Sequence, residues 1–332
     1  MSEPENNTNG RTIAITGTTG FVGSRVLVRV VESGHSARIL VRNPPKARKM
    51  LDDRKIDSEH VEIIEGGVSD PDALAKLVRG ASACIHLVGI IREADHGQTF
   101  ERIHVDAARA IVGACAHENQ SMRYVHMSAL GVGPDDRAGY RDTKHRAELI
   151  VKASKLDWTI MRPGLIHGER GEFTQMAAAW VRGKAPPFVF LPYFSRWKTN
   201  GFGFEAPSVA PIHVDDVAHA FVNALDRPET IHSTYELVGP DSMTFPEMLK
   251  VYQRHVPGAK SWLRPIGLPW RIAAIQARLA SAIGLGKLLP FDEGMAIMGG
   301  RDSIADPHPA GEALGLALAR FEETLGTYAD SL

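Results

Sequence analysis

Three polar side chains near the middle of the chain have the types and the order needed to move a proton. Tyr140 and Lys144 are four positions apart in the segment YRDTK, which places both on one face of a helix. An ammonium beside a phenol favours the phenolate, so the tyrosine is expected to exchange a proton nearer neutral pH. Ser128 follows an apolar run, and its hydroxyl can hold a substrate oxygen against Tyr140. Behind a glycine-rich segment, this order predicts acid–base chemistry.

That glycine-rich segment has the spacing G-x-x-G-x-x-G and lies between a β-branched run at 13–16 and a stretch with helical apolar spacing. Strand, glycine turn and helix in this order predict a dinucleotide phosphate site. A sharp turn, close approach of a phosphate and tight helix packing each require a residue without Cβ, and the helix N-terminus offers free N–H groups. The alternative is a glycine-rich turn without a ligand. The predicted cofactor-binding residues of this segment are Gly17, Thr18, Thr19, Gly20, Phe21, Val22 and Gly23.

A basic residue, Arg42, follows the second strand-like run at 36–41. In a dinucleotide-binding unit an acidic residue at this place binds the ribose 2′-OH, whereas arginine suits a 2′-phosphate. The segment ARILVRN contains no Asp or Glu, and Lys46 and Arg48 add positive charge nearby. The sequence therefore favours NADP(H) over NAD(H), although a solvated basic loop is an equal alternative for Lys46 and Arg48.

The elements that must position these residues alternate along the first half of the chain. Strand-like runs lie at 13–16, 36–41, 61–65, 81–88, 124–127 and 158–161, and helix-like stretches include 99–117 and 140–153. This alternation predicts an α/β fold, a Rossmann-type doubly wound parallel sheet whose ligands bind at the carboxyl ends of the strands. Further along, 212–225 is expected to be a helix, 234–238 a strand, and the remainder mostly helical.

The expected domain organisation follows from this pattern. A disordered lead-in is expected at 1–10, and an NAD(P)-binding domain at 11–165, to which 208–228 returns. Segments 166–207 and 229–332 are expected to form a smaller, mostly helical C-terminal substrate lobe.

Composition excludes several classes of protein. The chain of 332 residues is 44% hydrophobic with a formal net charge of −1, which favours neither nucleic acid nor an anionic membrane as partner. No apolar run is long enough for a transmembrane helix, and the N-terminus lacks the pattern of a signal peptide. Cys84 and Cys115 are expected to be buried free thiols, which favours a reducing, cytoplasmic location.

Several other charged and histidine residues have simpler interpretations. His86 is expected to be a packed core residue, and Asp215 and Asp216 near His213 to cap a helix, so no metal site is predicted. The apolar and basic residues at 268–289 favour a helix packed on the lobe, with docking on a membrane or a partner as the alternative. Cations of the lobe could meet an anionic substrate or form a solvated surface; these are Arg182, Lys184, Arg196 and Lys198.

The motifs TGTTGFVG, IHLVG, HMSALG, YRDTK, RPGLIHG and PIHVDDVAHA together resemble the short-chain dehydrogenase/reductase superfamily, in its extended and atypical branch of NAD(P)-dependent epimerases, dehydratases and reductases. The resemblance covers roughly residues 12–240. Within that branch, LVGIIRE, TFERIHVDAARAIV and HMSALG are similar to the NAD(P)H-binding accessory subunit of respiratory complex I and its bacterial relatives.

The resemblance implies a role for each matching residue. Ser128, Tyr140 and Lys144 would be the catalytic residues, with Lys144 also binding the nicotinamide ribose. Arg42 would meet the adenosine ribose phosphate, and further cofactor contacts would come from Val68, Gly89, Pro163 and Ile166. Two positions depart from the family pattern: His104 replaces an asparagine that supports a proton-relay water, and Gly67 replaces an aspartate that touches adenine.

Two functions remain open at this point. One is an NADP(H)-dependent oxidoreductase or epimerase-type enzyme acting on an unidentified small molecule by hydride transfer, with Tyr140 as acid and base. The other is an NADP(H)-binding accessory or assembly protein with little turnover, associated peripherally with a membrane complex. The sequence names neither the substrate nor the oligomeric state.

Overall fold

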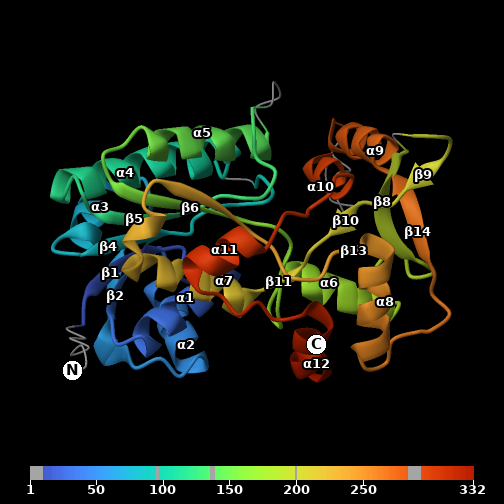
Figure 1. Cartoon of the computed structure of the whole chain (residues 1–332), viewed down its shortest axis with the longest axis horizontal. Helices are drawn as coiled ribbons and strands as arrows, with labels where there is room; N and C mark the ends of the chain where they lie inside the picture. Colours follow the sequence, from blue (N-terminus) through green and yellow to red (C-terminus); the bar gives the residue numbers. More distant parts are fainter. Residues whose placement is uncertain (1–9, 95–96, 135–138, 199, 283–292) are drawn as a thin grey trace.

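Seven parallel strands form the central sheet of the protein, in the order β12-β6-β5-β4-β1-β2-β3 (Figure 1). The computed structural model describes residues 10–94, 97–134, 139–198, 200–282 and 293–332, so the expected lead-in at 1–10 lies, apart from Gly10, outside the described residues. The strands are β1 (Thr12–Thr16), β2 (Ser36–Val41), β3 (Val61–Glu65), β4 (Ala83–His86), β5 (Arg123–Met127), β6 (Asp157–Pro163) and β12 (Ser233–Leu237). Ile13 pairs with Ala37 of β2 and with Ala83 of β4, which fixes the register at the centre of the sheet.

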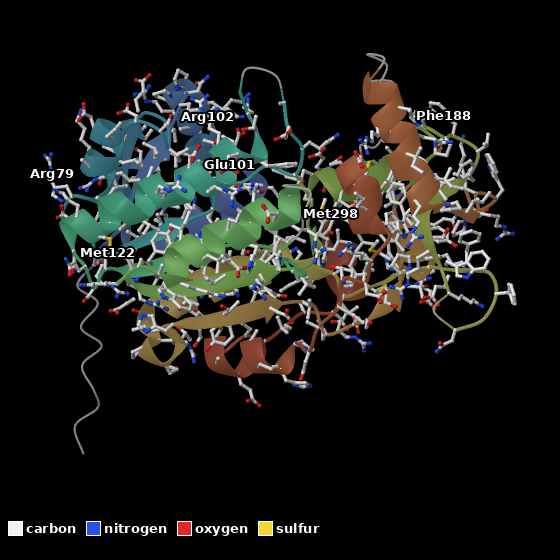
Figure 2. All side chains as sticks on the ribbon, turned by 90° about the horizontal axis from the view of Figure 1, so that it is seen from above. Arg79, Glu101, Arg102, Met122, Phe188 and Met298 are labelled. Atoms are coloured by element: carbon white, nitrogen blue, oxygen red, sulfur yellow. The ribbon has the colours of Figure 1, made fainter. Side chains whose placement is uncertain are left out.

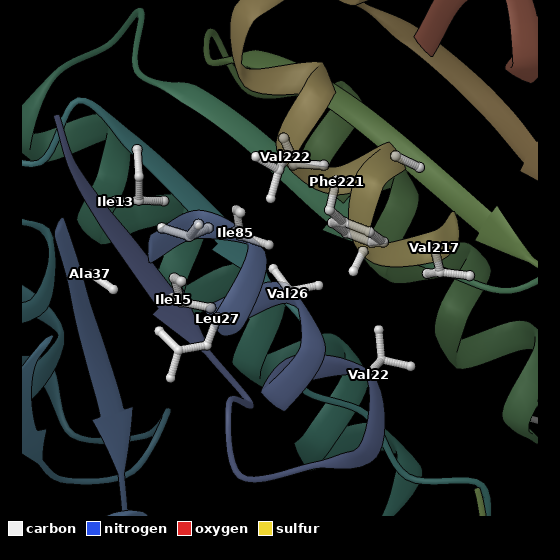
Figure 3. Packing of buried hydrophobic residues seen from close by; sticks show 14 of the residues in the cluster. Ile13, Ile15, Val22, Val26, Leu27, Ala37, Ile85, Val217, Phe221 and Val222 are labelled. Carbon is white, nitrogen blue, oxygen red and sulfur yellow. The ribbon is translucent and has the colours of Figure 1, made fainter. Parts of the chain in front are cut away.

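Helices cover both faces of this sheet (Figure 1). On one face lie α1 (Phe21–Glu32), α2 (Pro44–Asp53), α7 (Val214–Asn223) and α11 (His308–Leu314). On the other lie α3 (Pro71–Val78), α4 (Ala107–Glu118) and α5 (Tyr140–Lys152). Figure 3 shows Phe221 and Val217 of α7 packed beside Val22 and Val26 of α1. Complete burial of a side chain such as Phe221 stabilises the fold by about 1.5–3 kcal/mol.

The chain order of the strands reverses between β1 and β4, which lie side by side. Loops that leave the carboxyl ends of two such strands diverge, and the space between them is where doubly wound sheets bind their ligands. The glycine segment follows β1 and Gly89 follows β4, so both lie at this point.

A lobe at the other end of the molecule is built around a three-stranded sheet of order β14-β8-β9 (Figure 1). Its strands are β8 (Leu191–Trp197), β9 (Phe204–Glu205) and β14 (Pro265–Pro269), and its helices are α6 (Glu172–Val181), α8 (Phe245–His255), α9 (Trp270–Ala282), α10 (Glu293–Gly299) and α12 (Phe321–Tyr328). Two short pairs, β7 (Ile166–His167) with β11 (Ile212–His213) and β10 (Ser208–Val209) with β13 (Met243–Thr244), complete the strands. Seen from above, Phe188 marks the far end of the lobe and Arg79 the opposite end of the molecule (Figure 2).

The structure differs from the expected division and boundaries at four places. Strand β12 and helix α11 fall within 229–332 but belong to the central sheet and its core, because the edge of β6 and the α7 surface remain uncovered without them. The helix expected at 212–225 begins at Val214, since Ile212 and His213 pair with β7. The helix expected at 99–117 begins with a π-helical segment, Glu101–Asp106. The strand expected at 81–88 is shorter, Ala83–His86.

Among the residues that the structure describes, we find no helix with the length and apolar content to span a bilayer.

Candidate active site

The glycine segment forms a turn in which two of the three glycines, Gly17 and Gly23, are sterically required. A Cβ at Gly23 would lie 2.1 Å from the carbonyl oxygen of Gly17, and one at Gly17, whose φ is +82°, would lie 2.9 Å from the backbone of Leu87. The amide of Gly20 closes the turn by donating to the Gly17 carbonyl at 3.1 Å. Gly20 then precedes α1 without a side-chain cap, which leaves the first N–H groups of the helix for another acceptor. The turn therefore offers a cradle of backbone donors at a positive helix end.

Two side chains of the turn support a ligand at this cradle. Thr18 is fully buried, and its Oγ1 has no hydrogen-bond partner among the described residues, an arrangement that a phosphate or ribose oxygen would relieve. Val22 is packed in the core, so only its backbone faces the turn, while Phe21 is partly buried. The residues present thus fit a dinucleotide pyrophosphate.

The other predicted cofactor residues lie along the same edge of the sheet. Arg42 follows β2 and is exposed, and Val68 follows β3 with its side chain packed against the core beneath α3. Pro163 ends β6, where its carbonyl accepts the N–H of Leu130 at 2.9 Å, and Ile166 begins β7. All four occupy carboxyl ends of strands or the turns that follow them, as the predicted site requires.

Tyr140 and Lys144 lie in the first turns of α5, next to the carboxyl ends of β4 and β5. The Nζ of Lys144 donates to the carbonyl of Met127 at 2.9 Å, and a Cβ at Gly89 would approach this Nζ to 2.9 Å. Burial lowers the pKa of Lys144 to about 8, although Glu148 opposes the shift. Burial also raises the pKa of Tyr140 to about 12. This direction is opposite to the one expected from the sequence, because removal of the phenol from water disfavours its charged form.

Ser128 is buried and does not present its hydroxyl to an open site. The hydroxyl donates to Oε1 of Glu148 at 2.5 Å, and Glu148 also accepts two hydrogen bonds from Arg162, at 2.8 and 2.6 Å. Burial alone would raise the pKa of Glu148, but the hydrogen bonds from Arg162 and Ser128 outweigh it and lower the pKa. The role of Ser128 in holding a substrate oxygen stays a prediction, and in this structure its hydroxyl is engaged by the adjacent carboxylate.

His104, in the π-helical segment, connects three elements of the site. Its Nδ1 lies 2.9 Å from Oγ1 of Thr143, and its Nε2 lies 3.2 Å from the amide nitrogen of Ile90. Nε2 also lies 3.1 Å from the carbonyl oxygen of Ile90, so the tautomer of the ring sets which of its nitrogens donates. Burial and the nearby Lys144 lower the pKa of His104 to about 3, so the ring is neutral. The ring meets Tyr140 edge-on, with centroids 5.4 Å apart.

Comparison with known proteins identifies the family to which this site belongs. Residues 17–181 match a family model described as NAD(P)H-binding. A ceramide reductase of Caulobacter vibrioides is 30% identical over 257 residues, which cover 77% of this chain and 73% of that protein. The chain belongs to the NAD(P)H-binding, extended short-chain dehydrogenase/reductase family.

A second relative agrees with the narrower resemblance, and a solved structure agrees with the fold. NADH dehydrogenase [ubiquinone] 1 alpha subcomplex subunit 9 of Arabidopsis thaliana is 25% identical over 81% of this chain, although the match covers only 63% of that protein. The structure of a UDP-glucose 4-epimerase from Brucella ovis in complex with NAD has a TM-score of 0.66 at 15% identity, with 96% of both chains covered. This last likeness establishes the fold alone.

Two features of the site in this short-chain dehydrogenase/reductase were not predicted from the sequence. The first is the buried ion pair of Glu148 with Arg162, in which Glu148 also binds Ser128. Lys144 and Glu148 are four residues apart on one helix face, and this spacing could have indicated that Glu148 lies at the site. Gly168 packs against Phe21 of the glycine turn, where an added Cβ would lie 3.2 Å from the ring. This contact joins the segment after β7 to the cofactor cradle.

The remaining predicted residues have structural roles. His86 is buried, and its Nδ1 lies 2.7 Å from Oγ1 of Thr16, as expected of a packed core histidine. The cap of α7 is His213 rather than the aspartates: its Nδ1 accepts the N–H of Asp215, whose carboxylate pairs with Arg25. Asp216 instead accepts the N–H of Ala319. Cys84 and Cys115 are buried and free, as predicted.

Proposed function

We propose that this protein is an NADP(H)-dependent oxidoreductase or epimerase-type enzyme, with Tyr140 as proton donor and acceptor. The observation that carries the proposal is that Tyr140 and Lys144 lie on one helix beside Gly89, behind an intact glycine cradle. The bound nicotinamide would supply or accept the hydride. Tyr140 would give its hydroxyl proton to a substrate oxygen on reduction, or take it back on oxidation.

The neighbouring residues would act through Tyr140 and the cofactor. Lys144 would bind the nicotinamide ribose, and His104 would hold the tyrosine ring by its edge-on contact. Ser128 enters the proposal as a positioning residue, which fixes Glu148 one helical turn from Lys144. Gly17, Gly20 and Gly23 would bind the pyrophosphate, and Pro163 and Ile166 would border the nicotinamide.

The preference for NADP(H) rests on Arg42. Its guanidinium is exposed after β2, at the place where the family meets the adenosine ribose, and no carboxylate follows this strand. We expect calorimetric titration to give tighter binding of NADPH than of NADH. Arg42→Asp would weaken NADPH binding by roughly tenfold to a hundredfold, the loss of a hydrogen-bonded charge pair. Arg79→Asp is the matched control, because Arg79 is also exposed but follows α3 instead of the carboxyl end of a strand.

Catalysis is tested with Tyr140→Phe. In a screen of carbonyl compounds that follows NADPH oxidation, the variant should lose at least about a hundredfold in kcat, the usual contribution of a positioned acid, with cofactor affinity kept. Tyr235→Phe, on β12, is the control. Full turnover by Tyr140→Phe would disprove the mechanism.

A second function is an NADP(H)-binding accessory protein with little turnover, peripherally associated with a membrane complex. The raised pKa of Tyr140 and the histidine at position 104 favour it, as does the similarity to the NADH dehydrogenase subunit. Co-purification with a respiratory complex, together with no turnover in the carbonyl screen, would select it. For either function we propose a reducing, cytoplasmic location, supported by the two free buried thiols.

A further inference from the structure

The outward face of α9 carries larger apolar side chains than its inward face. Ala273, Ala274 and Ala277 are buried, while Ile272, Ile275 and Leu279 are 55%, 59% and 62% exposed. Their spacing of three and four residues places these three on one stripe of the helix. A helix that packs only against its own domain buries its large apolar residues, so this arrangement indicates contact with something outside the chain.

Exposed aromatic residues lie at the same end of the lobe. The turn between β8 and β9 carries Trp197, Phe202 and Phe204, which are 56%, 93% and 51% exposed. The rings of Trp197 and Phe204 meet edge-on, 5.2 Å apart. Pro269 pairs in register with Ser195, so α9 begins beside the end of β8 that bears Trp197, as Figure 1 shows. We call these three aromatic residues and the α9 stripe the apolar face.

Cations lie beside the apolar face, and one of them, Arg196, pairs with Glu205 and Asp302. Segments 173–204 and 256–291 contain nine Lys and Arg residues and no Asp or Glu, in a chain whose formal net charge is −1. Arg271 and Arg278 are exposed on α9 itself, and Lys198 is exposed next to Trp197. The positive charge is thus concentrated in these two segments, in a chain that is near neutral overall.

We propose that the apolar face docks on an anionic lipid bilayer. Exposed aliphatic and aromatic side chains beside exposed cations are the combination that binds the headgroup region of such a membrane. A second copy of this chain is a poor occupant, because it would bring like charges together. The proposal goes beyond the proposed function and does not depend on catalysis.

The test is sedimentation of the full chain with phosphatidylcholine vesicles that contain or lack phosphatidylglycerol. We expect binding to the mixed vesicles only, weakened by salt. The double variant Arg271→Gln/Arg278→Gln should lose roughly fivefold per cation, and Ile275→Ser/Leu279→Ser roughly tenfold or more. Leu149→Ser, an equally exposed leucine on α5, and Lys155→Gln are the matched controls and should bind as the wild type.

Three results of the binding assay would each overturn the proposal. They are absence of binding to the mixed vesicles, equal binding to phosphatidylcholine alone, and binding that neither double variant weakens. Self-association of the wild type that is lost in Ile275→Ser/Leu279→Ser would also overturn it, by assigning the face to a second copy. No cofactor or substrate is present in the assay, so its result is independent of the proposed enzyme activity.

Discussion

Replacement of Gly23 by alanine tests the cofactor cradle with a single methyl group. The added Cβ would lie 2.1 Å from the Gly17 carbonyl oxygen and 2.8 Å from the Thr18 Cα. To restore an ordinary contact of 3.4 Å the turn must retreat by about 1.3 Å, which exceeds the tolerance of a hydrogen bond between its amides and a phosphate. Each hydrogen bond to a charged group contributes about 1.5–3 kcal/mol. Loss of even one weakens binding by roughly tenfold to a hundredfold.

The same substitution elsewhere supplies the control. Gly113 lies within α4, is exposed, and a Cβ there meets nothing within 4 Å. Gly113→Ala should stabilise the protein by about 0.5–1 kcal/mol through helix propensity, with unchanged NADPH binding. Gly23→Ala should instead lose about 1–3 kcal/mol of unfolding free energy from overpacking. Calorimetric titration and denaturant unfolding measure both quantities. If Gly23→Ala binds NADPH as tightly as Gly113→Ala, the argument that the cradle requires a glycine here is refuted.

Three further variants test the buried polar groups of the site. Because burial lowers the pKa of Lys144 from 10.5 to about 8, the unfolded state binds the extra proton between these pH values. The unfolding free energy should therefore rise with pH in this window by at most about 3 kcal/mol in the wild type, and Lys144→Met should lack this rise in denaturant titrations. Glu148→Gln should lower the free energy of unfolding by about 3–5 kcal/mol, since Arg162 loses its buried partner. Glu62→Gln, in the exposed pair with Arg38, is the control and should cost about 1 kcal/mol or less. Equal losses would contradict the burial of the pair between Glu148 and Arg162. His104→Ala should leave Ile90 and Thr143 without their hydrogen-bond partner and lower the free energy of unfolding, measured by thermal unfolding, by about 1–3 kcal/mol. Exposed His117→Ala is the control. A loss no larger than that of His117→Ala would mean that the ring does not connect the segments of Ile90 and Thr143.

Local pattern was enough to predict most of the fold. The strands at 36–41 and 61–65 were predicted to the residue, and α5 to within one residue, because buried parallel strands and amphipathic helices leave strong periodic signals. The glycine cradle was equally accessible, since the close contact of Gly23 with Gly17 lies within the segment, although the crowding of Gly17 by Leu87 depends on the fold. The position of β12 in the central sheet could not be predicted in this way, because its pairing with β6 depends on which strand edge the rest of the fold leaves uncovered.

The sequence by itself determined which chemical groups the site could contain: a glycine turn for a dinucleotide, an arginine after β2, and a tyrosine and a lysine one helical turn apart. Only the tertiary structure decided how those groups are used. Burial raises the pKa of Tyr140, and a carboxylate from the adjacent helix takes the hydroxyl of Ser128. It also decided that the isoleucines of α9 face outward while its alanines face the lobe. Dielectric environment, hydrogen-bond partners and the direction of a helix face all depend on residues distant in sequence, and so could not follow from local spacing.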